Sequence, residues 1–200
     1  MKRLLLFIML TFVLIPFTYG QIRGGLKGGV NISDFIITKS GDLFQQEQFS
    51  TRVSYHIGSY VQQSFTDRLA WQIEVLFSNK GYTYKFENST ENISLNYLNW
   101  PLLLVYKPIK LLELEFGPEL GYLISGEDLI QSFDVGIDIG ARFNISPKFL
   151  AGIRYSNGFP FKLNLDDSES QGYDPRYQNS VLQFYIGFNL INENVARDDE

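Results

Sequence analysis

The side chain best suited to acid–base chemistry is His56, the single histidine of this 200-residue chain. Ser54 lies two residues before it, so in a β-strand both side chains would point to the same face. Glu74, on a later segment, would complete the serine, histidine and acid set of an esterase. A hydrogen-bonded histidine in a polar interior is a far commoner arrangement. We therefore predict a non-enzymatic protein with no catalytic residues, and we keep an esterase centred on His56 as an alternative.

The sequence contains few residues or motifs of the kinds that bind metals, cofactors or nucleic acids. The chain contains no Cys, which excludes a thiol nucleophile and Cys-ligated zinc or iron–sulfur sites. The acidic run Asp166 to Glu169 lacks the glycine and the ligand spacing of a calcium loop. We find no phosphate loop or dinucleotide fingerprint, and the net charge of −5 gives no basic surface. We expect no metal site, no cofactor and no nucleic-acid partner.

The first 20 residues have the organisation of a secretory signal peptide. Lys2 and Arg3 form a charged start, and an apolar run extends from Leu4 to Phe17. This run is shorter than the roughly 20 residues of a comfortable membrane span. We predict cleavage after Gly20, which leaves an acidic, exported chain; an uncleaved anchor helix is the alternative.

The rest of the chain alternates between apolar and polar residues with a period of two, which is typical of β-strands with two different faces. The clearest run extends from Phe133 to Asn144. Pro101 lies inside another run, where the missing backbone donor predicts a bulge or a local irregularity. The runs together predict eight strands, at residues 22–34, 51–65, 68–86, 92–106, 111–124, 132–145, 148–157 and 180–191.

The predicted connections alternate between short and long, as they do in outer-membrane barrels with short periplasmic turns and long external loops. The short turns are at residues 66–68, 107–110 and 146–148. The longer connections are near residues 35–50, 86–92, 125–131 and 158–179.

The volume of the side chains indicates which face points into the barrel. The apolar face consists mostly of Phe, Leu, Ile, Tyr and Trp, whereas the opposite face is rich in Gly, Ser, Asn and Gln. An eight-stranded barrel has a narrow interior, so the bulky apolar set must point outward, toward lipid. We predict an all-β fold, an eight-stranded antiparallel up-and-down transmembrane β-barrel, with a soluble exported barrel as the alternative. The expected organisation is a signal peptide at 1–20, the barrel at 21–191 and a polar tail at 192–200.

The inward face would then carry acids and bases that neutralise one another. A narrow barrel filled by ion pairs is a plug rather than a pore, although a conducting or substrate-binding lumen remains the alternative. The predicted lumen network consists of Lys27, His56, Glu74, Lys80, Glu113, Glu115, Glu119, Asp134, Asp138, Arg142 and Arg154. The same face carries Asn31, Gln72 and Gln183.

Four segments, in order, carry a resemblance to a known family. They are Gly25–Ser33 (GLKGGVNIS), Leu98–Lys107 (LNWPLLLVYK), Phe116–Leu123 (FGPELGYL) and Arg154–Gly158 (RYSNG). In this combination the chain resembles the PorT-like outer membrane protein beta-barrel domain family of Gram-negative bacteria. The resemblance implies an eight-stranded barrel in the outer membrane and no defined activity. One departure is the polar tail that follows Leu190, because such barrels usually end at an aromatic residue.

These observations lead us to expect a non-enzymatic outer-membrane protein with a structural or partner-docking role through its long external loops. A component of a protein secretion or envelope-assembly machinery is the first alternative, since the namesake of the family takes part in secretion. A small-solute channel and a lipid A hydrolase acting through His56 are further alternatives. The expected partners are outer-membrane lipid and envelope or secretion proteins, and the sequence does not determine the oligomeric state.

Overall fold

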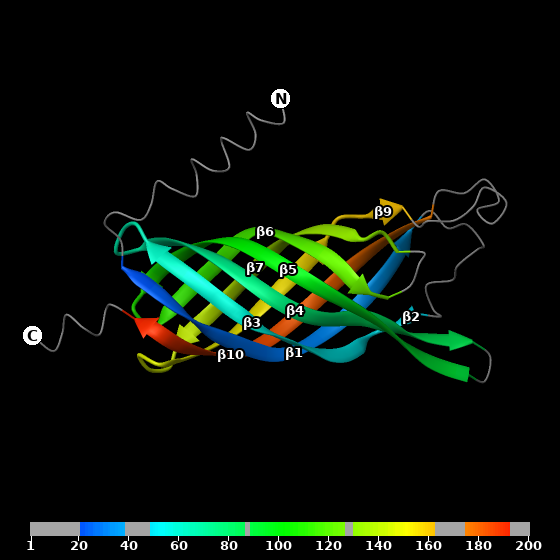
Figure 1. Cartoon of the computed structure of the whole chain (residues 1–200), viewed down its shortest axis with the longest axis horizontal. Coiled ribbons are helices and arrows are strands. Elements are labelled where there is room, and N and C mark those ends of the chain that lie inside the picture. Colours follow the sequence, from blue (N-terminus) through cyan, green and yellow to red (C-terminus); the bar gives the residue numbers. More distant parts are fainter. Residues whose placement is uncertain (1–20, 39–48, 87–88, 127–129, 163–174, 193–200) are drawn as a thin grey trace, which may run out of the picture.

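The computed structural model describes residues 21–38, 49–86, 89–126, 130–162 and 175–192. The predicted signal peptide, and the polar tail after Asn192, lie outside the described residues. Figure 1 shows long, tilted strands that wrap around one axis. No helix among the described residues is long and apolar enough to cross a membrane.

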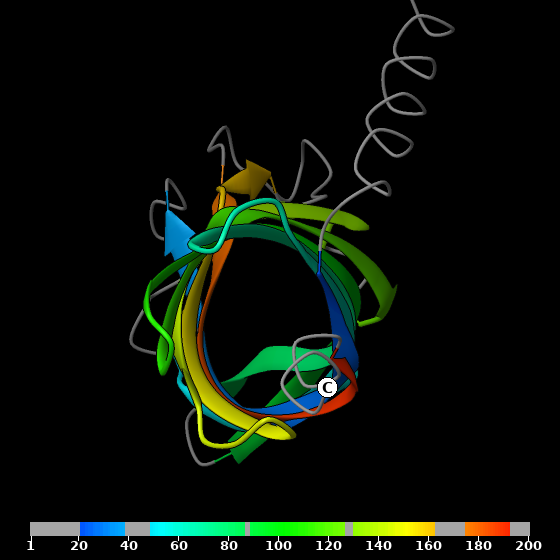
Figure 2. The same ribbon diagram turned by 90° about the vertical axis from the view of Figure 1, so that its left-hand side faces the viewer.

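Eight long strands form the wall, and each one pairs antiparallel with its neighbours. They are β1 (Ile22–Thr38), β3 (Arg52–Ser64), β4 (Leu69–Phe86), β5 (Ser89–Ile109), β6 (Leu112–Ser125), β7 (Phe133–Asn144), β8 (Phe149–Gly158) and β10 (Arg176–Asn192). Pairing of β1 with β10 closes the sheet into a barrel, seen end-on in Figure 2. The predicted fold class is therefore confirmed.

The two ends of the barrel differ. At one end, which we call the turn end, β1 begins, β10 finishes and tight turns join β3 to β4, β5 to β6 and β7 to β8. The opposite end, the loop end, has the longer connections. There the strands continue into segments that we had predicted as loops, at residues 35–38, 89–91 and 176–179. Two short strands that the sequence did not suggest also lie there: β2 (Phe49–Ser50) pairs with β4, and β9 (Phe161–Lys162) pairs with β10.

The irregularity predicted at Pro101 is present as a gap in the ladder rather than as a bulge. Pairing of β4 with β5 skips the positions between Ile73–Leu102 and Leu76–Asn99 and keeps its register. Proline has no N–H to donate, so an interruption is expected there. The register shifts of β5 against β6 lie elsewhere in that strand, beside Tyr97 and near the turn.

The register of the strands makes the interior a spiral. A line drawn through directly paired residues starts at Glu113 on β6 and passes through Arg142, Gly152, Tyr185, Gly29, His56, Ser78 and Tyr97. It returns to β6 at Leu123, ten residues beyond its start. A stagger of this kind is what closes a tilted sheet into a barrel. Residues of equal height in the lumen therefore come from different positions along their strands.

The outer face of the wall is apolar and the inner face is largely polar. Ile57, Ile139 and Ile186 lie within long, regularly paired strands, yet they are 60%, 58% and 63% exposed. Charged residues beside them in sequence, such as Asp138, are buried inside. Because this arrangement is the reverse of a soluble barrel, the outward face suits a hydrocarbon environment.

Candidate functional site

All eleven residues of the predicted lumen network are buried inside the barrel. The structure divides them between two levels. Those nearer the turn end form continuous ion pairs, whereas those nearer the loop end include more carboxylates than bases; unpartnered polar atoms occur at both levels.

Arg154 on β8 is the centre of the lower level. Its guanidinium group contacts both oxygens of Glu74 on β4, at 2.7 and 2.9 Å, and Glu115 Oε2 on β6 at 2.6 Å. Lys27 on β1 donates to the same Glu74 carboxylate at 3.0 and 3.2 Å. These four side chains come from four different strands, so they tie opposite walls of the barrel together.

Arg142 extends this arrangement toward the turn end. Its Nε donates to Glu113 Oε2 at 2.6 Å, and its Nη1 lies 3.0 Å from Glu115 Oε1. Arg23 on β1 reaches the same oxygen of Glu113 at 2.6 Å. Sequence reasoning missed Arg23, although its spacing of four residues from Lys27 puts both on one face of the strand. We call this set the ion-pair network: Arg23, Lys27, Glu74, Glu113, Glu115, Arg142 and Arg154.

Tyr185 on β10 fills the space between these charges. Its hydroxyl donates to Glu115 Oε2 at 3.0 Å, and the ammonium group of Lys27 lies 3.8 Å from its ring centroid. Room for the ring exists because residue 152 is glycine: a Cβ atom there would lie 2.5 Å from a ring carbon of Tyr185. The tyrosine therefore contributes both volume and a donor to the ion-pair network.

Nearer the loop end, one base faces several acids. Lys80 on β4 contacts Glu119 at 3.0 Å and Asp134 at 4.0 Å. Asp134 also accepts a hydrogen bond from Asn179 at 3.0 Å. Asp138 is fully buried, and its closest cation is Arg154, 3.7 Å away. This level of the lumen is therefore acidic.

His56 does not form the centre that an esterase would need. Its Nδ1 lies 2.7 Å from Asn31 Oδ1, while the amide nitrogen of Asn31 donates to two backbone carbonyls, so Nδ1 must be the donor. Ser54 instead donates to the backbone carbonyl of Asn79 at 2.5 Å. Glu74 is engaged by Arg154 and Lys27. The three candidate residues are not linked to one another by any hydrogen bond that the structure contains among its described residues.

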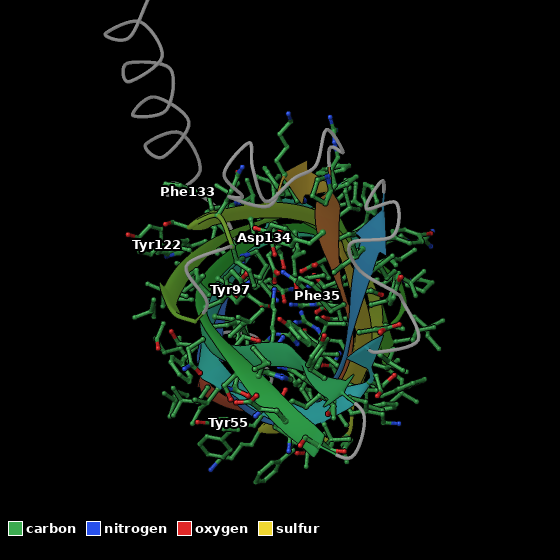
Figure 3. The ribbon with its side chains drawn as sticks, turned by 90° about the vertical axis from the view of Figure 1, so that its right-hand side faces the viewer. Phe35, Tyr55, Tyr97, Tyr122, Phe133 and Asp134 are labelled. Carbon is green, nitrogen blue, oxygen red and sulfur yellow. The ribbon has the colours of Figure 1, made fainter. Side chains whose placement is uncertain are left out.

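Apolar side chains close the lumen at the loop end. Phe35 on β1 stacks on Tyr82 of β4, with ring centroids 4.4 Å apart, and on Tyr177 of β10 at 5.5 Å. Figure 3, viewed from the loop end, shows Phe35 and Tyr97 pointing into the barrel while Tyr55 and Tyr122 point away from it. We call this buried cluster the aromatic cap: Phe35, Tyr82, Leu95, Tyr97, Ile130 and Tyr177. Sequence reasoning missed it, because Phe35, Ile130 and Tyr177 lie where loops were expected and the other three members were not recognised as facing the interior.

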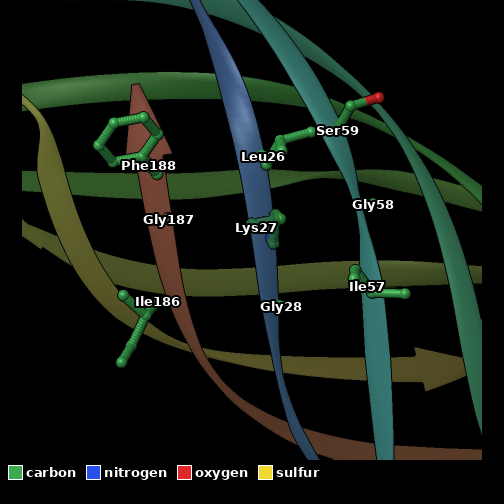
Figure 4. Close-up of a pocket in the computed structure, with 9 residues that line it drawn as sticks. All are labelled: Leu26, Lys27, Gly28, Ile57, Gly58, Ser59, Ile186, Gly187 and Phe188. Carbon is green, nitrogen blue, oxygen red and sulfur yellow. The ribbon is translucent and has the colours of Figure 1, made fainter. Parts of the chain in front are cut away.

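A shallow groove on the outer wall crosses β10, β1 and β3 (Figure 4). Gly28 leaves a gap there between Ile57 and Ile186, which pair with it on either side. Its lining is apolar side chains and glycines together with Ser59 and Lys27, and the side chain of Lys27 is buried in the lumen. The charged side chains of the wall instead point into the lumen.

Comparison with known proteins supports the same fold and location. The chain belongs to the family described as outer membrane protein beta-barrel domain, whose sequence model matches residues 19–161. The outer membrane protein OprG of Pseudomonas aeruginosa superposes with a TM-score of 0.50 at 13% identity, over 86% of this chain and 95% of its own. The protein is therefore an outer-membrane β-barrel.

Two other solved barrels are similar at lower scores. Neisserial surface protein A gives a TM-score of 0.48 at 10% identity, over 82% of this chain and 96% of its own. Ail, the attachment invasion locus protein of Yersinia pestis, gives 0.42 at 15% identity, over 86% of this chain and 100% of its own. Among curated proteins, none matches the sequence.

Proposed function

We propose that this outer-membrane barrel is a closed, non-enzymatic scaffold that presents its loop end to a partner outside the cell. The observation that carries this proposal is the ion-pair network, in which Arg154 joins Glu74 and Glu115 across the lumen at distances below 3 Å. The aromatic cap adds a second closure above it. A lumen filled at two levels leaves the ends of the barrel as the surfaces available for function.

The loop end offers more surface for docking than the turn end. The hairpin of β4 and β5 projects beyond its neighbours (Figure 1), and β6 pairs with β5 only as far as Asn96. Residues 89–94 of β5 therefore have one strand edge without a described neighbour, and such edges accept an extended segment of another chain. Most residues of the predicted external loops lie outside the described residues.

A conductance measurement distinguishes a closed scaffold from a solute channel. We expect purified protein in a planar lipid bilayer to give no steady conductance, because an ion would have to displace buried, paired charges. Reproducible single-channel openings would contradict the closed lumen and favour the channel alternative. Mass spectrometry of lipid A, with and without the protein, tests the hydrolase alternative in the same cells.

Site-specific cross-linking in intact cells tests the docking role. The chain has no Cys, so single-cysteine variants label one position each. We compare Thr90→Cys at the loop end with Asp67→Cys at the turn end, both exposed. A defined protein adduct at Thr90→Cys alone is the expected result. Adducts at Asp67→Cys alone would contradict external docking.

A component of a secretion or envelope-assembly machinery is the second candidate. It rests on the resemblance of four segments, beginning with Gly25–Ser33, to the PorT-like family. A periplasmic partner captured at Asp67→Cys would favour this candidate, because the short turns of outer-membrane barrels face the periplasm.

A further inference from the structure

Five buried side chains between the ion-pair network and the aromatic cap carry polar atoms that have no hydrogen-bond partner among the described residues. We call them the acceptor ring: His56, Asn99, Glu119, Asp138 and Gln183. Each is at most 4% exposed. Buried polar groups are almost always satisfied by protein or by ordered solvent, so something other than protein must occupy this level of the lumen.

Strand pairing and side-chain contacts link the five residues around the lumen. Gln183 pairs with Asn31, the acceptor for His56, on one side. On its other side it pairs with Arg154, which lies 3.7 Å from Asp138. These links connect inward side chains on β3, β1, β10, β8 and β7 around one side of the lumen.

The remaining half of the ring is linked in the same way. Asp138 lies directly opposite Ser156 on β8, and the hydroxyl of Ser156 donates to Glu119 Oε1 at 3.2 Å. Asn99 donates its amide to the same oxygen at 2.5 Å. Two carboxylates therefore approach one serine, and the second oxygen of Glu119 remains without a donor.

Nearly all the unpartnered atoms are acceptors. They comprise Nε2 of His56, Oδ1 of Asn99, Oε2 of Glu119, both carboxylate oxygens of Asp138 and Oε1 of Gln183; the single donor is Nε2 of Gln183. His56 contributes a lone pair because its Nδ1 carries the proton. A cluster of six acceptors and one donor matches a cation with its water, rather than an anion or an apolar molecule.

The charge balance of the buried side chains indicates the charge that a bound ion would carry. Five buried cations, Arg23, Lys27, Lys80, Arg142 and Arg154, face six buried carboxylates. If all six carboxylates are ionised, one negative charge is left over, which a monovalent cation would neutralise. No group of three or more His, Cys, Asp or Glu side chains is arranged for a metal among the described residues. The ring is therefore not a cage of three such ligands, and an ion there would be held in part by amide oxygens and water.

We propose that the acceptor ring holds one hydrated monovalent cation, Na⁺ or K⁺, between the carboxylates of Asp138 and Glu119. The ion-pair network and the aromatic cap lie on either side of this level, so the ion would be taken up as the barrel forms and would stay occluded. This proposal is compatible with a closed lumen but does not depend on a docking role.

The test is to refold the full mature chain into lipid in NaCl, in KCl or in N-methylglucamine chloride at constant ionic strength. Because the ion binds only the folded barrel, the melting temperature should rise by about 3–6 °C for each tenfold increase in the bound cation above its Kd. N-methylglucamine is much larger than Na⁺ or K⁺ and should have no such effect. Equal melting temperatures in all three salts would overturn the proposal.

Asp138→Asn removes the surplus charge and should abolish the salt-specific shift. The matched control is Asp67→Asn, which removes the same charge from an exposed turn and should retain the shift. If Asp138→Asn does not fold, crystals of the wild-type protein grown with Tl⁺ give a second readout. An anomalous peak beside Asp138 supports the proposal, and a lumen without such a peak overturns it. A wild-type stability that responds to pH but not to cation identity would show that a proton takes this place.

Discussion

Between the turn end and Arg154 the lumen is filled by charges that satisfy one another, whereas at the loop end it is filled by stacked aromatic rings. In the lower half, each carboxylate of Glu74 and Glu115 contacts at least two cations. In the upper half, the stacked rings of Phe35 and Tyr177 bury apolar surface and add few polar groups to the interior. The comparison shows that one barrel can be closed by two kinds of packing, which respond differently to substitution.

The largest effect should come from breaking the lower half. Arg154→Met leaves Glu74 and Glu115 with one buried cation fewer, and loss of one partner from a buried ion pair costs about 3–5 kcal/mol of unfolding free energy. Denaturant unfolding in lipid vesicles, followed by tryptophan fluorescence, measures this cost. Lys148→Met in an exposed turn is the control and should change the unfolding free energy by less than about 0.5 kcal/mol. Equal costs for the two variants would show that the network adds no stability.

Substitutions on the outer face extend this comparison, because that face contacts lipid and does not fill the lumen. Ile139→Arg places a charge against hydrocarbon and should cost about 2–4 kcal/mol near the bilayer midplane. The same change at Ile145, in the turn between β7 and β8, should cost about 0–1 kcal/mol. Asp138→Asn, the neighbouring inward position, should cost less than Ile139→Arg. If Asp138→Asn unfolded the protein while Ile139→Arg were neutral in bilayers, the assignment of faces would be wrong.

A single hydrogen bond within the ion-pair network gives a smaller effect. Tyr185→Phe removes the hydroxyl that donates to Glu115, and a hydrogen bond to a charged group contributes about 1.5–3 kcal/mol. Tyr155→Phe removes an exposed hydroxyl from the outer face and should have a much smaller effect on the free energy of unfolding. Indistinguishable unfolding curves for the two variants would argue that Tyr185 only fills space.

The smallest effect is expected in the aromatic cap. Phe35→Leu retains most of the buried volume, and such exchanges usually cost less than about 1.5 kcal/mol. We expect faster amide hydrogen exchange at the loop-end residues of β1, near Ser33, with unchanged protection near Lys27. A uniform loss of protection along β1 would indicate that the two halves of the lumen unfold together.

The sequence predicted the parts of the fold that period-two alternation determines. Alternation assigned Lys27, Glu74 and Arg154 to the inner face, and it located the eight long strands to within a few residues, apart from their extensions at the loop end. It could not assign partners, because pairing of Arg154 with Glu74 depends on the stagger of the closed sheet. That stagger is a property of the whole ring and has no local signature.

Two features escaped prediction for different physical reasons. Phe35 and Tyr177 lie beside polar residues at strand ends, where alternation is short, so their stacking depends on contact between β1 and the distant β10. Arg23 lies at the start of β1 beside the predicted cleavage site and was not counted among the lumen bases. Its contact with Glu113 is a consequence of closure.

The distance in sequence between Glu74 and Arg154 also constrains how the barrel enters the membrane. The two residues are 80 positions apart and lie on β4 and β8. A hairpin of β3 and β4 that inserted alone would carry Glu74 into hydrocarbon without its cation, at a cost of several kcal/mol. A hairpin of β7 and β8 would carry Arg142 without Glu113, and Arg154 with only Asp138 in place of its two glutamates. Insertion one hairpin at a time is therefore unfavourable, and the strands must gather so that opposite charges meet before, or as, the wall reaches lipid.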